Sequence, residues 1–192
     1  AGKGGFRMQA SRWFSYRFRA RYGETDQMGV VYHANYVNWF EIGRTELIRE
    51  MGFPYRQIER LGLYLPFVDL TMKFRQPARY DDVIEVFTRI VEFSNATIRF
   101  ESQVRRAEGV PDTVPVGSGG TAGFCAPVAP VRAEIEPEGE LLVSGTTRHV
   151  WLNRQWKPVR LDREAPDLYE LLRRSVEGET EQTQIRRGRS GV

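Results

Sequence analysis

The chain of 192 residues has the size of one domain, or at most two small ones. Hydrophobic residues make up 41% and charged residues 28% of it, which excludes a fibrous protein and a wholly disordered one. The formal net charge is +3, but residues 1–22 hold six basic and no acidic side chains, whereas the remainder holds 22 basic against 25 acidic ones. The positive charge is therefore local, and binding of nucleic acid is not expected.

The single cysteine, Cys125, excludes an internal disulfide bond and a metal site built from several cysteines. It fits a reducing compartment, and we expect a cytoplasmic protein. The longest apolar run, residues 124–131, is far shorter than the roughly 20 residues of a membrane helix. The N-terminus contains no apolar signal core either. Stable insertion into a membrane is therefore not expected.

The first half of the chain predicts one strand and two helices. Residues 1–11 are expected to form a flexible leader, and residues 12–22 alternate between apolar and polar side chains, as a half-buried strand does. Apolar residues at three- and four-residue steps then predict a long, largely buried helix over residues 35–51. Gly52 and Pro54 are typical of its end. A short second helix is expected near residues 55–61.

The second half predicts four more strands, over residues 68–75, 83–93, 98–105 and 141–152. The run 83–93 is β-branched and aromatic on both faces, which indicates a central strand, and Ser94-Asn95 predicts a hairpin after it. Residues 107–139 are rich in proline and glycine and predict a structureless loop insert. We regard it first as an inert surface excursion, with a lid or a subunit contact as the alternatives.

A helix is expected over residues 166–174, and residues 176–192 are expected to be a disordered tail. The order of elements is strand, long helix, short helix, four strands and terminal helix. This order predicts an α+β fold, an antiparallel sheet with a helix packed on one face. We place it in a single domain over residues 12–175.

One segment brings together residue types that catalyse acyl transfer. Asp26 and His33 lie on the connection that leads into the long helix. The first N–H groups of a helix lack partners within it and carry positive dipole character, so they can stabilise an oxyanion. A structural interpretation stands beside this one, because Asp26 could form a turn and His33 or Asn35 could cap the helix.

Residues 26–36, read as DQMGVVYHANY and followed by Trp39, Phe40 and Glu41, closely resemble the signature of the 4-hydroxybenzoyl-CoA thioesterase family. The branch associated with the Tol–Pal system looks nearest. Residues 66–78 and 145–149 agree as well, and the resemblance covers residues 12–106 and 140–172. It implies a hotdog fold, in which a curved antiparallel sheet wraps around a long central helix, and an acyl-CoA thioesterase.

The resemblance also implies roles for individual residues. Asp26 matches the family's catalytic aspartate, which acts as a nucleophile or as a general base on water. His33 matches the position whose backbone N–H binds the thioester oxygen, and the adjacent helix start predicts a neutral imidazole there. Tyr32, Asn35 and Trp39 are the expected substrate-binding residues.

The family's chemistry needs no metal and no organic cofactor, so none is expected here. The implied substrate is an acyl-CoA or an acyl-carrier-protein thioester. Active sites in the family form between subunits, so we expect a homodimer or a homotetramer.

Other candidate residues are interpreted as structural. Glu41 and Arg44 are three residues apart and are expected to pair on the helix, although a related branch uses a helix glutamate in catalysis. His149, on a strand, is expected to pack or to lie at the surface rather than to catalyse, and two distant histidines have no metal-ligand spacing. Residues 117–122 contain a loose glycine pattern, but neighbouring prolines exclude a nucleotide-binding strand and helix.

Three alternatives to a thioesterase are considered. A hotdog dehydratase also uses histidine and a carboxylate. A non-catalytic acyl-CoA-binding or interaction module is disfavoured by Asp26, because binding alone needs no carboxylate there. Nucleic-acid binding is the weakest, since no stacking motif accompanies the arginines. The polar face formed by Arg17, Arg19 and Arg21 is either solvated or attracts the phosphates of a CoA-like substrate.

Overall fold

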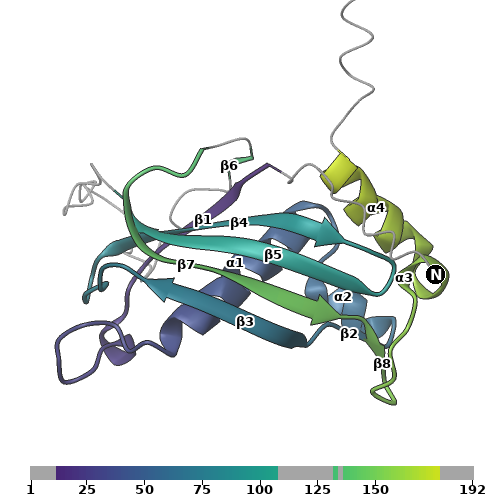
Figure 1. Ribbon diagram of the computed structural model, residues 1–192, viewed down its shortest axis with the longest axis horizontal. Helices are drawn as coiled ribbons and strands as arrows, with labels where there is room; N and C mark the ends of the chain where they lie inside the picture. The colour runs from purple at the N-terminus through teal and green to yellow at the C-terminus, as the bar shows by residue number, and fades with distance from the viewer. Residues whose placement is uncertain (1–11, 108–131, 134–135, 178–192) are drawn as a thin grey trace, which may run out of the picture.

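The computed structural model describes residues 12–107, 132–133 and 136–177. Their main feature is a six-stranded antiparallel sheet in the order β3-β7-β5-β4-β1-β6, which curves around helix α1 (Figure 1). The strands are β1 (Phe14–Arg19), β2 (Leu63–Tyr64), β3 (Phe67–Phe74), β4 (Val83–Phe93), β5 (Thr97–Arg106), β6 (Arg132–Ala133), β7 (Glu140–Val150) and β8 (Leu152–Asn153). The helices are the 3-10 turn η1 (Tyr22–Glu24), α1 (Asn35–Glu50), α2 (Tyr55–Arg60), α3 (Leu161–Glu164) and α4 (Pro166–Glu177).

Helix α1 ends as its sequence predicts. Gly52 takes a φ of 93°, which favours glycine, and the Phe53 N–H donates to the Ile48 carbonyl at 3.2 Å. Along the helix, Tyr36, Phe40 and Leu47 are buried against the sheet. Only Asn38, Glu41, Arg49 and Glu50 of this helix are exposed, and its other twelve residues are buried or half-buried.

The predicted hairpin is confirmed. Strand β4 has the predicted bounds, lies between β1 and β5, and is buried over most of its length. The Ser94 N–H donates to the Thr97 carbonyl at 2.9 Å, and Phe93 pairs with Ile98 across the turn. The antiparallel sheet and the helix packed on it confirm the predicted α+β class and the arrangement expected of a hotdog fold.

Two glycines allow α1 to lie directly on the sheet. A Cβ atom on Gly43 of α1 would lie 2.4 Å from Thr88 Oγ1 of β4. A Cβ atom on Gly145 of β7 would lie 2.1 Å from the Thr71 carbonyl oxygen and 2.9 Å from Cε2 of Phe40. The glycines therefore set the position of α1, including its N-terminal end.

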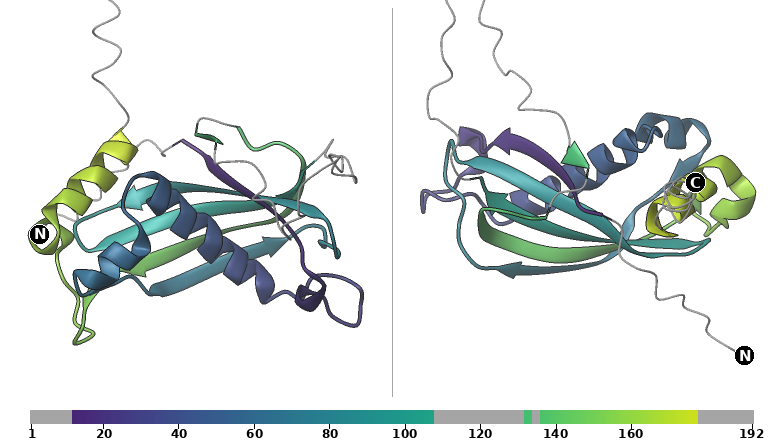
Figure 2. Two further views of the ribbon diagram at one scale, coloured as in Figure 1. Left: turned by 180° about the vertical axis from the view of Figure 1, so that it is seen from behind. Right: turned by 90° about the horizontal axis from the view of Figure 1, so that it is seen from above.

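The far end of the sheet is covered by elements that the sequence predicted only in part. Helix α4 continues to Glu177, past the predicted end at 174 and into the expected tail, and packs through Leu168 and Leu172 (Figure 2). Helix α3 and the pairing of β2 with β8 were not predicted. These elements are too short for a periodic pattern, so tertiary contacts decide them.

Two other expectations differ from the structure. Tyr22 lies in η1 and is 78% exposed, instead of continuing the apolar face of β1. Strand β6 falls within the insert predicted to be structureless, and pairs with Phe14 and Ser15 of β1. The other predictions for this insert, the expected leader over residues 1–11 and the tail from residue 178 concern residues outside the described ones.

The arginines of β1 are largely neutralised by acids of the sheet. Arg17 Nε donates to Glu85 Oε2 at 3.1 Å, and Arg19 Nη1 lies 3.4 Å from Asp81 Oδ2. This favours the structural interpretation of the N-terminal charge. Among the described residues no helix is both long and apolar enough to cross a membrane.

Candidate active site

The segment between η1 and α1 forms a tight loop at the N-terminal end of α1 (Figure 1). Thr25 forms an antiparallel bridge with Val31, and the Asp26 N–H donates to the Val30 carbonyl at 2.9 Å. Gly29 turns the chain with a φ of 72°, a conformation that favours glycine. The bridge closes the loop at Thr25 and Val31, and Asp26 is the first loop residue after it.

Asp26 has one carboxylate oxygen engaged and one available. Its Oδ1 atom accepts a hydrogen bond from the Met28 N–H at 2.8 Å, which is the turn predicted by the structural interpretation. Its Oδ2 atom has no hydrogen-bond partner among the described residues, and the side chain is half-buried. The turn therefore orients the carboxylate and leaves its second oxygen free to accept a hydrogen bond.

The free backbone donors lie just before α1 rather than within its first turn. The N–H groups of Asn35, Tyr36 and Val37 donate to the carbonyls three residues earlier, at 2.9, 3.3 and 3.1 Å. Within the part of the chain that the structure describes, the N–H groups of His33 and Ala34 donate to no acceptor, and both residues are exposed. These two N–H groups are therefore free to donate to an acceptor outside the described chain.

The imidazole of His33 is not paired with Asp26. His33 lies two residues beyond Val31, on the helix side of the bridge, and its ring packs 4.2 Å from the ring of Tyr32. No hydrogen bond joins the Asp26 and His33 side chains among the described residues. In the described structure these two side chains therefore form no carboxylate–imidazole pair.

Glu24, which the sequence analysis did not single out, organises the start of α1. Its Oε1 atom accepts from Trp39 Nε1 at 2.9 Å, and its Oε2 atom accepts from the Arg21 N–H at 2.7 Å. Its carbonyl accepts from Asn35 Nδ2 at 2.7 Å and from the Tyr32 N–H at 2.8 Å. The sequence carries no capping-box signature here, because the Arg21 side chain has no acceptor at the first position of that motif, so only the folded structure reveals the role of Glu24.

This network changes the role expected for Trp39. Its side chain has no exposed surface, and its indole N–H is taken by Glu24, so in this chain it is a core residue that supports the loop. Asn35 is half-buried and ties the helix start to Glu24. Of the three expected binding residues, Tyr32 is the most exposed, at 46%.

Tyr36 connects α1 to the 75–82 loop on the other side of the site. Its hydroxyl oxygen accepts a hydrogen bond from the Ala78 N–H at 2.8 Å, and the Ala78 carbonyl accepts from the Val31 N–H at 2.8 Å. Burial raises the pKa of Tyr36, so the phenol stays neutral. Exposed aromatic side chains gather around these two loops, namely Tyr22, Tyr32, Phe74 and Tyr80.

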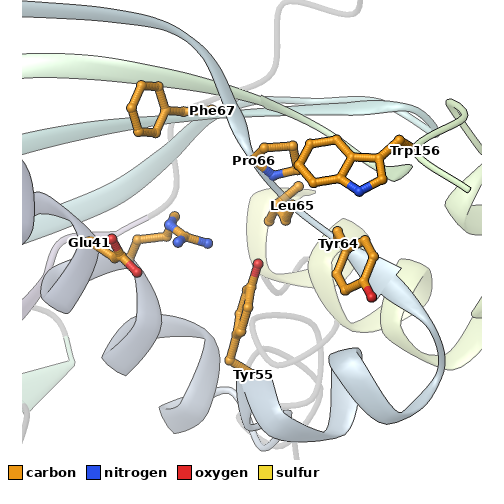
Figure 3. Close-up of a pocket in the computed structure, with 8 residues that line it drawn as sticks. Glu41, Tyr55, Tyr64, Leu65, Pro66, Phe67 and Trp156 are labelled. Atoms are coloured by element: carbon orange, nitrogen blue, oxygen red, sulfur yellow. The ribbon is translucent and has the colours of Figure 1, made fainter. Parts of the chain in front are cut away.

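A cavity of about 380 Å³ opens farther along α1 (Figure 3). In Figure 3 the ring of Tyr55 stands from α2 toward Leu65 and Pro66. The lining residues are Glu41, Arg44, Tyr55, Tyr64, Leu65, Pro66, Phe67 and Trp156.

The expected pairing of Glu41 with Arg44 is wrong. Among the described residues no ion pair within 4.0 Å joins them, because Arg44 lies 7% exposed over the ring of Tyr55, 5.2 Å from its centroid. Glu41 remains exposed.

His149 packs inside the domain, which is one of the two structural roles expected of it. It is 2% exposed, its Nδ1 atom lies 3.1 Å from the Leu65 carbonyl oxygen, and its Nε2 atom lies 2.9 Å from Thr147 Oγ1. Burial lowers the pKa of His149 to about 4, and the positive charge of Arg44 acts in the same direction. No group of three potential metal ligands exists among the described residues.

We expect His149 to make the fold less stable in mild acid. The unfolded chain binds a proton near pH 6.5 and the folded chain only near pH 4. The contribution is therefore complete above about pH 6.5 and is lost as the pH falls toward 4, by on the order of 3 kcal/mol. Urea unfolding between pH 7 and pH 4 should show this slope, and His149→Gln should flatten it. His33→Ala, which changes the other, exposed histidine, should leave the pH dependence of stability unchanged. If His149→Gln shows the same pH dependence as the native chain, His149 is not its source.

Comparison with known proteins gives consistent results. Residues 20–167 match the thioesterase-like superfamily. YneP of Bacillus subtilis, which carries the provisional name of an acyl-CoA thioesterase, is 30% identical over 148 residues, covering 77% of this chain and 86% of YneP. The acyl-CoA thioesterase YbgC of Haemophilus influenzae is 37% identical over 94 residues, covering 48% of this chain and 69% of YbgC. The crystal structure of a DHNA-CoA thioesterase from Staphylococcus aureus aligns with a TM-score of 0.67 at 25% identity, covering 94% of this chain and 96% of that one.

Proposed function

Because the chain belongs to the thioesterase-like superfamily, we propose that it hydrolyses acyl-CoA thioesters at the loop that leads into α1. As a member of this family it is a thioester hydrolase with a hotdog fold. The observation that supports this site is the combination of an available Asp26 oxygen with the unused N–H groups of His33 and Ala34 in one loop. These are the two groups that thioester hydrolysis requires.

The proposed reaction uses each of these groups once. The thioester carbonyl oxygen accepts hydrogen bonds from the His33 and Ala34 N–H groups, whose donor character the adjacent helix dipole increases. With Asp26 as a general base, the carboxylate removes a proton from water as the water oxygen attacks the carbonyl carbon, and the carbon–sulfur bond then breaks. With Asp26 as a nucleophile, the carboxylate attacks the carbonyl carbon, the carbon–sulfur bond breaks to leave an anhydride, and water then cleaves that anhydride. In both routes the thiolate leaves and takes up a proton.

A phosphate-bearing thiol ester fits the charge at this end of the molecule. Lys73, Arg75 and Arg79 are exposed beside the 75–82 loop, and among the described residues none of these three side chains forms an ion pair. Unpaired cationic side chains attract phosphates more strongly than the neutralised arginines of β1. We therefore assign binding of the coenzyme phosphates to this loop and not to Arg17 and Arg19.

A second copy of the chain is the proposed partner. Strand β3 is an edge of the sheet over eight residues, and it exposes Phe67, Val68 and Phe74. A long, apolar edge strand is normally covered by another chain. We propose that two copies associate along β3, which light scattering would show as twice the monomer mass.

The test of the function is the release of thiol from a series of acyl-CoA esters, aliphatic and aromatic, followed with a thiol-reactive dye. We expect turnover with free acid and free CoA as products. A dehydratase would instead remove water from a 3-hydroxyacyl-CoA and release no thiol. A binding module would bind the esters and release no thiol. Dehydration without thiol release, or binding without thiol release, would contradict the proposal.

Two variants of His33 separate its backbone from its imidazole. His33→Ala keeps the N–H, so we expect kcat to stay within about tenfold of wild type. His33→Pro removes the N–H, and we expect kcat to fall by about a hundred- to a thousandfold. Proline fits the backbone here, because the Asn35 N–H to Tyr32 carbonyl bond closes a turn with His33 at its second position.

Thermal unfolding of both variants controls for folding. If His33→Ala loses as much activity as His33→Pro at equal stability, the imidazole rather than the N–H carries the reaction.

A further inference from the structure

Arg44 is a buried cation without a counterion. It is 7% exposed, and its Nη1 atom is buried without a hydrogen-bond partner. Among the described residues no carboxylate lies within ion-pair distance of its guanidinium. A buried charge of this kind is costly unless a partner compensates it. The ring of Tyr55 stabilises the positive charge through a cation–π contact, but it carries no negative charge that would neutralise the guanidinium.

The other charges around the cavity do not neutralise Arg44. Glu41 lines the same cavity but is exposed, so water screens its charge. His149, on β7, is neutral at pH 7 because its pKa is about 4. The described surroundings of Arg44 therefore carry an excess of positive charge that an anionic group would compensate.

The cavity also offers apolar walls to a small ligand. Tyr55, Tyr64, Phe67 and Trp156 line it together with Leu65 and Pro66, and its volume of about 380 Å³ lies in the range of small-molecule sites. Figure 3 shows these side chains on α2, on the segment from β2 to the start of β3 and on the turn after β8, with the ring of Trp156 beside Pro66. A short carbon chain would fit between them.

One face of α1 leads from the proposed reaction centre to this cavity. Ala34, Asn38 and Glu41 are exposed, and with Arg44 they follow each other at steps of four, three and three residues, which places them on one helix face. Ten residues separate Ala34 from Arg44, about 15 Å along the axis. Side chains on a helix point back toward its N-terminus, which shortens the span for the long Arg44 side chain.

We propose that this cavity binds the acyl part of the substrate and that Arg44 pairs with a carboxylate at the far end of the acyl chain. The substrate class is then the CoA monoester of a dicarboxylic acid. This inference rests on the proposed thioesterase function. Arg44 acts as a specificity residue and takes no part in cleaving the thioester.

The test compares chains of equal length that differ only at their ends. We expect kcat/KM to be at least tenfold higher for adipyl-CoA than for hexanoyl-CoA, or for suberyl-CoA than for octanoyl-CoA. Arg44→Gln should lower this ratio at least tenfold. Arg49→Gln is the matched control, because Arg49 is an exposed arginine on the same helix that pairs with Glu46. It should keep the wild-type ratio.

Several outcomes would overturn the inference. One is a wild-type enzyme that hydrolyses the methyl-ended esters equally well or better. Another is an Arg44→Gln variant whose ratio is unchanged and whose dimer dissociates, which would make Arg44 a subunit contact. If Arg44→Gln does not fold, competitive inhibition of the wild-type enzyme by adipate but not by hexanoate decides in favour, and equal inhibition decides against. Failure to hydrolyse any acyl-CoA would contradict the proposed function itself.

Discussion

Replacing Asp26 with asparagine should lower kcat for acyl-CoA hydrolysis by about a hundred- to ten-thousandfold, the usual contribution of a positioned base. The amide cannot remove a proton from water or form an acyl bond to the enzyme. Its oxygen can still accept the hydrogen bond that Oδ1 of Asp26 receives from the Met28 N–H, so the turn should survive. Steady-state kinetics with the best acyl-CoA of the series measures the effect.

Two controls make this result specific. Asp167→Asn changes an exposed carboxylate in the first turn of α4, and its kcat should equal that of wild type. The unfolding temperature of Asp26→Asn should lie close to that of the native chain. Near-normal turnover in Asp26→Asn would show that Asp26 only shapes the turn.

A single turnover in heavy-oxygen water tests the two roles open to Asp26. Direct attack by the carboxylate, followed by attack of water on the aspartyl carbonyl of the anhydride, places an enzyme oxygen in the first acid released and the solvent label in Asp26. General-base catalysis places the solvent label in the first acid and none in Asp26, and so does attack of water on the acyl carbonyl of an anhydride. Label in Asp26 therefore excludes general-base catalysis, and both results are compatible with thioesterase activity.

Replacing Gly145 with alanine should give the largest loss of stability. The added methyl group would lie 2.1 Å from the Thr71 carbonyl oxygen, a backbone atom that pairs within the sheet, and 2.9 Å from the Phe40 ring of α1. Neither neighbour can move without separating β7 from β3 or lifting α1. We expect a fall of about 3 kcal/mol in the free energy of unfolding, the upper end for overpacking.

Urea unfolding measures this loss as a lower midpoint at an unchanged slope. Gly23→Ala is the control, because a Cβ atom there meets nothing within 4 Å and its φ lies outside the strained range. It should change stability by less than about 0.5 kcal/mol. A similarly small change for Gly145→Ala would mean that α1 does not lie this close to the sheet.

Elements with strong local signals were predictable from the sequence. The apolar spacing of residues 36–47, together with Gly52 and Pro54, determines where α1 ends, because helix periodicity and chain termination are local properties. Strand β4 and its hairpin follow from a continuous apolar run and a turn signal for the same reason. The motif around Asp26 and His33 led to the family, which the comparisons confirm.

Other features depend on which residues meet across the fold, and the sequence alone does not determine them. Glu24 gains its role only because the loop brings it to the indole of Trp39, which burial in turn removes from the expected binding surface. The free donors are the N–H groups of His33 and Ala34, since the next three are used by the turn that starts α1.

Arg44 is the clearest case of this kind. Its position on the helix predicted an ion pair with Glu41, because Glu41 lies three residues earlier and carries the opposite charge. The packing of α1 against α2 instead places its guanidinium over Tyr55, at a cavity lined by residues from four parts of the chain. Local spacing thus determined the elements and the motif around Asp26 and His33. Long-range packing decided which charges are left without partners, because burial and neighbours are properties of the whole fold.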